Sequence, residues 1–83
     1  MIRVRYSRTS LKQLKKLPKA KQLEVLKKIE KLKNYPLSGK KLKGPLNKFR
    51  SLRSWPYRII YQYQNSEEVI KINVIQYRQS SYK

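Results

Sequence analysis

The stretch Arg50-Ser-Leu-Arg-Ser-Trp-Pro-Tyr-Arg-Ile-Ile-Tyr61 places two strand-like runs on either side of Trp55-Pro56. A third run follows after Asn65-Ser66, and Ile, Val and Tyr are frequent in all three. The runs cover residues 48–54, 57–64 and 69–76. Because the connections between them are short, these runs predict an antiparallel meander.

The N-terminal half of the chain predicts one more strand and two helices. Apolar residues alternate with arginines over residues 2–6, which is the pattern of a half-buried strand. Ser7 or Thr9 can cap a first helix, and Pro18 can open a second helix that runs to about Asn34. Both helices carry an apolar stripe, which we expect to pack against the sheet.

The order of elements is therefore β-α-α-β-β-β, an α+β fold in which both helices cover one face of a four-stranded antiparallel sheet. Residues 35–47 contain both glycines and two of the four prolines, so we expect a long basic loop there. No composition shift divides the chain, and we expect one domain over residues 1–83. The second face of the sheet can stay exposed, and a ligand could lie on it.

Absent residue types exclude several kinds of chemistry. The chain has no Cys, no His and no Asp, so we expect no disulfide, no metal site and no cofactor. No apolar run approaches the ~20 residues of a membrane span, and the N-terminus lacks the apolar segment of a signal peptide. We therefore expect a cytoplasmic protein that does not bind membranes.

The net charge points to a polyanionic partner. The chain carries 22 Lys and Arg against 4 acidic residues, all Glu, which gives +18. A field of this sign attracts nucleic acid by releasing its counterions, and it also attracts acidic proteins. We therefore expect RNA, the ribosome surface or an acidic protein as a partner.

Basic residues gather where the predicted strands meet. If the last hairpin turns at Asn65-Ser66, Arg53 lies roughly opposite Arg78, and Arg58 is one short turn away. Tyr82 can reach the same end of the sheet. A phosphate would neutralise the three guanidinium groups. Alternatively, the aliphatic parts of the arginine side chains cover apolar surface, or their guanidinium groups bind backbone carbonyls.

Several further residues are candidates for contacting RNA. They are Lys41, Lys43, Lys48, Arg50, Arg53 and Trp55. The indole of Trp55 could stack on a base or fold back on its own hairpin. We expect Phe49, Ile60 and Val74 in the core, together with Ile59, Ile70 and Ile72, and we expect Tyr61 to be buried with a hydrogen-bonded hydroxyl.

The side chains that remain can still cleave RNA. Tyr, Lys, Arg and Ser offer neither a metal site nor the usual acid-base pair of His or paired carboxylates. In RNA, however, the substrate's own 2′-hydroxyl is the nucleophile. The protein then needs only to align that hydroxyl, stabilise the charge that develops on the phosphate and assist proton transfer.

Five segments in order resemble the RelE/ParE toxin superfamily of type II toxin-antitoxin systems. They are Ser10-Leu-Lys-Gln-Leu-Lys-Lys-Leu-Pro18, Leu42-Lys-Gly44, Ser51-Leu-Arg, Tyr57-Arg-Ile-Ile-Tyr61 and Tyr77-Arg78 with Tyr82. The short helical hairpin is similar to the RelE branch. The resemblance implies a ribosome-dependent mRNA endoribonuclease (mRNA interferase) that leaves a 2′,3′-cyclic phosphate and a 5′-hydroxyl, and it implies an acidic antitoxin as partner.

The resemblance also implies roles for single residues. Arg58 corresponds to the phosphate-binding arginine, Arg78 to the C-terminal arginine, and Tyr82 to the tyrosine that stacks on a base or takes part in proton transfer. The chain has Phe49 and Ser51 where RelE enzymes can carry lysines. Two other functions stay open, namely a ParE-like topoisomerase inhibitor and an RNA- or ribosome-binding module that does not cleave.

Overall fold

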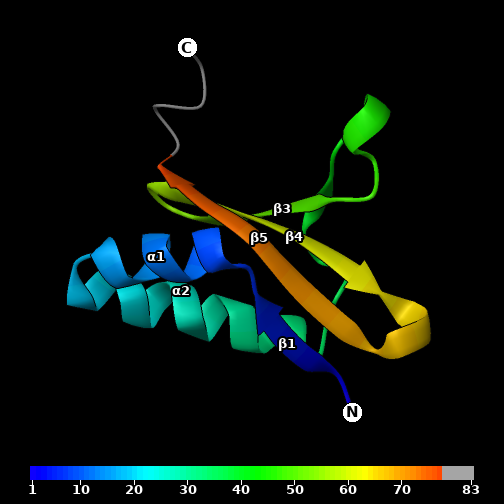
Figure 1. Ribbon diagram of the computed structural model, residues 1–83, viewed down its shortest axis with the longest axis horizontal. Coiled ribbons are helices and arrows are strands. Elements are labelled where there is room, and N and C mark those ends of the chain that lie inside the picture. The colour runs from blue at the N-terminus through cyan, green and yellow to red at the C-terminus, as the bar shows by residue number, and fades with distance from the viewer. Residues whose placement is uncertain (78–83) are drawn as a thin grey trace.

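The fold consists of two α-helices and a five-stranded sheet (Figure 1). It is described by a computed structural model, for residues 1–77. The elements are β1 (Arg3–Tyr6), α1 (Arg8–Lys16), α2 (Lys19–Leu32), β2 (Lys40–Lys41), the 3-10 turn η1 (Gly44–Leu46), β3 (Arg50–Ser54), β4 (Tyr57–Gln64), the 3-10 turn η2 (Asn65–Glu67) and β5 (Val69–Tyr77). The predicted α+β class and the order of helices and main strands are confirmed.

The sheet differs from the expected four antiparallel strands in two ways. Its order is β1-β5-β4-β3-β2, and β1 runs parallel to β5. The two helices carry the chain from β1 at one edge to β2 at the other, so that β1 pairs with the last strand. A fifth strand lies in the segment predicted as a loop, where Lys40 pairs with Ser51 and Lys41 with Arg50.

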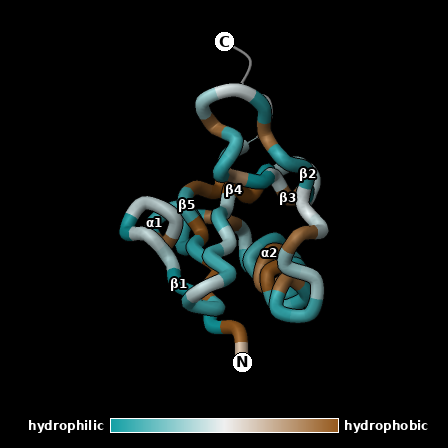
Figure 2. The backbone as a smooth tube through the Cα atoms, turned by 90° about the vertical axis from the view of Figure 1, so that its right-hand side faces the viewer, coloured by the Kyte–Doolittle hydropathy of each residue, from teal (hydrophilic) through white to brown (hydrophobic). Residues whose placement is uncertain are grey.

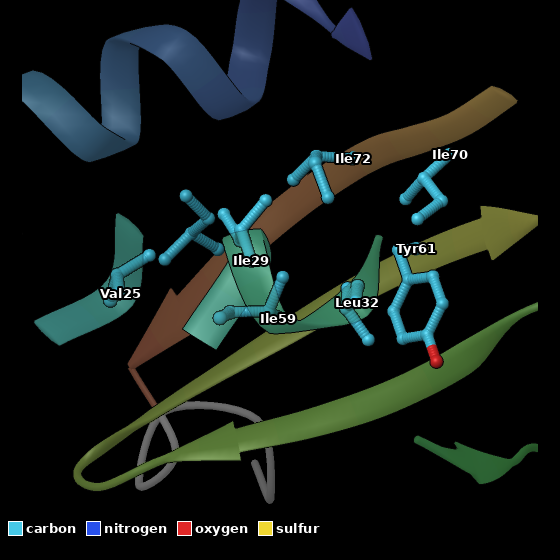
Figure 3. Packing of buried hydrophobic residues seen from close by; sticks show 8 residues of the cluster. Val25, Ile29, Leu32, Ile59, Tyr61, Ile70 and Ile72 are labelled. Atoms are coloured by element: carbon cyan, nitrogen blue, oxygen red, sulfur yellow. The ribbon is translucent and has the colours of Figure 1, made fainter. Parts of the chain in front are cut away.

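Both helices pack on one face of the sheet, as Figure 1 shows. Ser7 caps α1, because its side chain accepts a hydrogen bond from the Ser10 amide at 3.0 Å. Helix α2 buries Val25, Ile29 and Leu32, which are three or four residues apart and therefore lie on one side of the helix. Figure 3 shows this stripe against side chains of the sheet, namely Ile59, Tyr61, Ile70 and Ile72.

A bulge in β5 changes which side chains enter the core. Ile60 pairs with Val74, but Tyr61 pairs with Ile72, so Asn73 is an extra residue. As a result Ile75 faces the core and Val74 lies with Ile60 on the opposite face. The expected core positions of Ile60, Val74 and Phe49 were wrong: none of the three belongs to the core cluster.

Helix α1 and its N-cap Ser7 bind backbone groups of the bulge. Strand β1 ends at Tyr6, opposite Ile72, and leaves the edge of β5 uncovered beyond that point. There the Ser7 hydroxyl donates to the Asn73 carbonyl at 2.6 Å, and the Gln13 side chain accepts from the Ile75 amide at 2.6 Å. Because its polar groups are paired in this way, the bulge is a stable feature of the fold.

The sheet face opposite the helices is called the open face below. The segment between β2 and β3 rises above it, away from the helices, in both views (Figures 1 and 2). This segment forms a wall beside the open face. Within residues 1–77, neither helix combines the length and the apolar character that crossing a membrane requires.

Candidate nucleic-acid interface

Arg53 and Arg58 are direct cross-strand partners on the open face. The turn at Trp55-Pro56 joins β3 to β4 and sets this register. The neighbouring pair, Leu52 and Ile59, packs on the core, so the arginines point to the other face. The two guanidinium groups therefore project from neighbouring strands on the same face of the sheet.

The expected position of Arg53 opposite Arg78 lies outside the described residues, because Arg78 is not among them; the partner that the structure gives Arg53 is Arg58. Strand β4 lies between β3 and β5, so β3 has no partner in β5. The second neighbour of Arg58, on β5, is Gln76. The turn at Asn65 fixes the register of β4 with β5 only, and it could not place a residue of β3. The predicted catalytic residues Arg78 and Tyr82 lie outside the described residues.

A basic hollow of about 310 Å³ surrounds the arginine pair. It is lined by Lys40, Lys41, Leu42, Lys43, Ser51, Arg53 and Arg58. Two of the lysines that were predicted to contact RNA, Lys41 and Lys43, thus lie beside the arginines. No carboxylate is among the described residues that line this hollow, so its charge favours an anion.

The remaining predicted RNA contacts lie elsewhere. The Arg50 guanidinium donates to the carbonyl oxygens of Gly39 and Leu37 at 2.9 and 3.2 Å. Arg50 thus holds the segment before β2, which is a structural role. Lys48 is exposed, and Trp55 is 57% exposed. Neither residue lines the basic hollow.

An apolar hollow of about 530 Å³ adjoins the basic one on the open face. It is lined by Leu42, Leu46, Phe49, Arg58, Ile60, Asn73, Val74 and Gln76. The apolar hollow was not predicted, because strict alternation along β5 places Val74 in the core. Only the bulge at Asn73 brings the Val74 side chain to the open face. Arg58 and Leu42 line both hollows, so a charged group and an apolar surface lie next to each other.

Tyr61 is buried with a paired hydroxyl, as predicted. Its hydroxyl donates to the Pro36 carbonyl at 2.8 Å and accepts from the Gly39 amide at 2.9 Å. Burial raises the pKa of Tyr61 above its ordinary value, although the Gly39 bond and the charge of Arg50 oppose this rise. The residue therefore connects the core to the segment before β2 and is not placed to react with a ligand.

The described side chains favour charge stabilisation over metal chemistry. Within residues 1–77, no three His, Cys, Asp or Glu side chains gather where they could hold a metal ion. Guanidinium and ammonium groups can bind a phosphate and stabilise charge that develops on it. An apolar floor beside them can take a flat ring such as a nucleobase.

This fold is that of a class of small toxins. The sequence profile described as "ParE toxin of type II toxin-antitoxin system, parDE" matches residues 4–82. The chain belongs to this toxin family. The superfamily that the sequence motifs indicated is thereby confirmed, while a search of curated proteins found no match.

Solved structures support the same assignment. The chain is similar to the RelBE2 toxin-antitoxin complex of Mycobacterium tuberculosis, with 28% identity, a TM-score of 0.84 and coverage of 93% of this chain and 98% of that chain. The archaeal RelE-RelB complex of Pyrococcus horikoshii gives 27% identity, a TM-score of 0.77 and coverage of 93% and 94%. The isolated E. coli RelE toxin has 19% identity, a TM-score of 0.82 and coverage of 93% and 84%, which shows the fold alone.

Proposed function

We propose that this toxin is a RelE-like mRNA endoribonuclease that acts on the ribosome. The observation that carries the proposal is the pair Arg53 and Arg58 inside a basic hollow without a carboxylate among its described lining residues. A phosphodiester of single-stranded RNA matches this charge, and the adjoining apolar hollow suits a base. The likeness to RelE toxins supports the same reading.

The proposed reaction uses the substrate's own 2′-hydroxyl and no metal ion. The 2′-oxygen attacks the adjacent phosphorus, and the bond from phosphorus to the 5′-oxygen breaks. The 2′-hydroxyl loses its proton, and the leaving 5′-oxygen gains a proton. The products are a 2′,3′-cyclic phosphate and a 5′-hydroxyl. Arg58 would bind the phosphate and stabilise its developing charge.

Arg78 and Tyr82 complete the proposed site. In this proposal, which follows the family resemblance, Arg78 is a second charge stabiliser and Tyr82 stacks on a base or transfers a proton. Both follow the end of β5, whose Gln76 is the cross-strand neighbour of Arg58.

We also propose that a cognate acidic antitoxin silences the toxin in the cytoplasm. Similar solved structures are complexes of toxins with antitoxins. The charge of +18 makes an acidic partner favourable, since its carboxylates would reduce repulsion among the basic side chains.

The test is cleavage of a defined mRNA by the purified toxin with programmed ribosomes. We expect fragments that end in a 2′,3′-cyclic phosphate, and fewer of them with Arg58→Ala than with the matched surface variant Lys28→Ala, which lies on α2. The proposal would be overturned if the mRNA stays intact on programmed ribosomes at a toxin concentration equal to that which arrests the growth of cells.

A topoisomerase inhibitor is the second candidate, because the matching family profile bears the ParE name. A supercoiling assay separates the two. Inhibition of a purified bacterial topoisomerase while ribosome-bound mRNA stays intact would favour the ParE-like function. Binding to ribosomes without either effect would favour a non-cleaving RNA-binding module.

A further inference from the structure

A second pair of like charges lies on the open face, at the opposite edge of the sheet from β2. Arg5 of β1 is the cross-strand partner of Lys71 of β5. The residues beside Arg5, Val4 and Tyr6, pack on the core, and Ile72 next to Lys71 is buried. Side chains alternate along a strand, so Arg5 and Lys71 both point to the open face.

The pair of Arg5 and Lys71 does not help the isolated fold. Like charges directly opposite each other on neighbouring strands are destabilising. The ion pairs found within residues 1–77 join Glu24, Glu30 and Glu68 to other cations, and none of them involves Arg5 or Lys71. An anion over Arg5 and Lys71 would therefore remove a repulsion that the protein itself leaves in place.

Three hollows join the two pairs across the open face. The first, of about 280 Å³, is lined by Arg5, Tyr6, Ser7, Lys71, Ile72 and Asn73. It shares Asn73 with the apolar hollow, which in turn shares Arg58 with the basic hollow. The hollows therefore adjoin one another at Asn73 and at Arg58, in the order basic, apolar and basic, and this series of hollows is called the track below.

The length of this track fits several nucleotides. Lys71 precedes Gln76, the partner of Arg58, by five residues, and β1 and β4 are separated only by β5. At about 3.3 Å per residue and about 4.8 Å per strand spacing, the two pairs are roughly 15–20 Å apart on a diagonal of the sheet. That distance exceeds what one phosphate group can bridge.

We propose that Arg5 and Lys71 form a second phosphate-binding site, and that single-stranded RNA runs from there across the open face to Arg53 and Arg58. This inference rests on the proposed RNA-directed function and extends it to the length of strand bound. A single strand alternates phosphates with exposed bases, as the track alternates basic and apolar sections. A duplex does not fit, because its bases are stacked inside and cannot reach the apolar floor.

Binding of labelled RNA to the purified toxin tests the proposal without ribosomes. The oligonucleotides carry 2′-O-methyl groups, so that the nucleophile is blocked and no cleavage can occur. For a strand of about ten nucleotides, Arg5→Gln with Lys71→Gln should weaken binding about tenfold and reduce the salt slope by about 1. A trinucleotide, which cannot span the track, should lose less affinity in the double variant than the longer strand does.

Two further variants separate a local contact from general loss of charge. Lys28→Gln with Lys31→Gln removes the same charge from exposed positions on α2, and it should weaken binding less than threefold. Arg5→Lys keeps the charge and should retain most of the affinity for the longer strand. The substituted side chains Arg5, Lys28 and Lys31 are exposed, so we expect both variants to fold as wild type does.

Three outcomes would overturn the track. They are an equal loss with the α2 pair, an equal loss for the trinucleotide, and equal affinity for a duplex of the same length. Loss of cleavage on ribosomes with the length-dependent binding intact would instead contradict the proposed reaction and leave the track standing. The two proposals therefore fail separately.

Discussion

The amide of Gly39 donates a hydrogen bond of 2.9 Å to the hydroxyl of Tyr61, and both residues are buried. The contact is so close that a Cβ atom on Gly39 would lie 2.6 Å from the hydroxyl oxygen. It ties the core of the sheet to the residue just before β2. Since Lys40 and Lys41 of β2 line the basic hollow, packing at Tyr61 sets one wall of the site.

Gly39→Ala should therefore destabilise the toxin. The added methyl group meets the ring and hydroxyl of Tyr61, which the core holds from the other side, and overpacking of this kind costs about 1–3 kcal/mol. The free energy of unfolding from urea titration measures the effect. Ser38→Ala, at the exposed neighbouring position, should change it by less than about 0.5 kcal/mol. Equal stability of the two variants would contradict the close contact.

Tyr61→Phe should lower the stability of the fold at neutral pH. It should also make that stability fall less steeply as the pH rises in the alkaline range. The variant leaves the Gly39 amide and the Pro36 carbonyl without their partner, at about 1–3 kcal/mol.

The alkaline effect follows from the raised pKa of Tyr61, whose cause is burial. Above the ordinary value of 10.0, the unfolded tyrosine ionises first, so stability falls as the pH rises towards the folded pKa. Urea titrations between pH 8 and 11 should show a steeper fall for wild type than for Tyr61→Phe. Some fall should remain in the variant, since burial also raises the pKa of Tyr6. Parallel curves would contradict the raised pKa.

Sequence reasoning placed the helices and the main strands because their signals are local. The Ser7 cap, the leucine and isoleucine spacing of α2 and the turn at Trp55-Pro56 each act within a few residues. The parallel pairing of β1 depends on where the helices return the chain, and no local pattern carries that information. The bulge at Asn73 is likewise held by Ser7, the N-cap of α1, and by Gln13 of α1, both far away in the sequence.

The same distinction applies to the candidate site. Arg58, Lys41 and Lys43 were predicted as site residues from their charge and, for Arg58, from hairpin geometry and the family resemblance, and all three line the basic hollow. Arg50 was indistinguishable from them in sequence, yet carbonyl oxygens of the preceding segment bind it. The pair Arg5 and Lys71 was missed, because it exists only through the parallel register of β1 with β5.

Arg58 and Arg50 should differ in what their loss affects. Arg58→Ala should reduce cleavage of ribosome-bound mRNA at least ~10²-fold, since Arg58 acts as a charge stabiliser. Arg50→Ala should lower the melting temperature, because two carbonyl oxygens lose their donor. Single-turnover cleavage and thermal melts of both variants make the comparison. Wild-type cleavage by Arg58→Ala would remove the arginine pair from the active site.

Variants of Arg78 and Tyr82 should distinguish charge stabilisation from base stacking. Arg78→Ala is expected to lose at least ~10²-fold in cleavage, as a second charge stabiliser. Tyr82→Phe should lose much less if the ring only stacks on a base, and comparably if the hydroxyl transfers a proton. A pH-rate profile of Tyr82→Phe distinguishes these roles, because only loss of a proton-transfer group changes its shape. Full activity of Arg78→Ala would contradict its proposed role.

Cleavage should not require a transition metal, because the proposed attack uses only the 2′-hydroxyl and cationic side chains. Programmed ribosomes should cut mRNA in chelator concentrations that bind trace zinc but leave ribosomal magnesium in place. The initial rate with and without chelator is the measurement. Activity that stops and returns only when zinc or manganese is added would contradict the mechanism.

The last prediction concerns the antitoxin and follows from a net charge of +18 on an 83-residue chain. An acidic segment laid on the basic surface would relieve repulsion as well as block the RNA site, so the complex should melt well above the free toxin. The difference in melting temperature should shrink between low salt and about 1 M, where the screening length is about 3 Å. Burial of apolar surface is not screened, so part of the difference should persist. A difference that does not change with salt would mean that the interface is apolar and that the basic surface serves RNA alone.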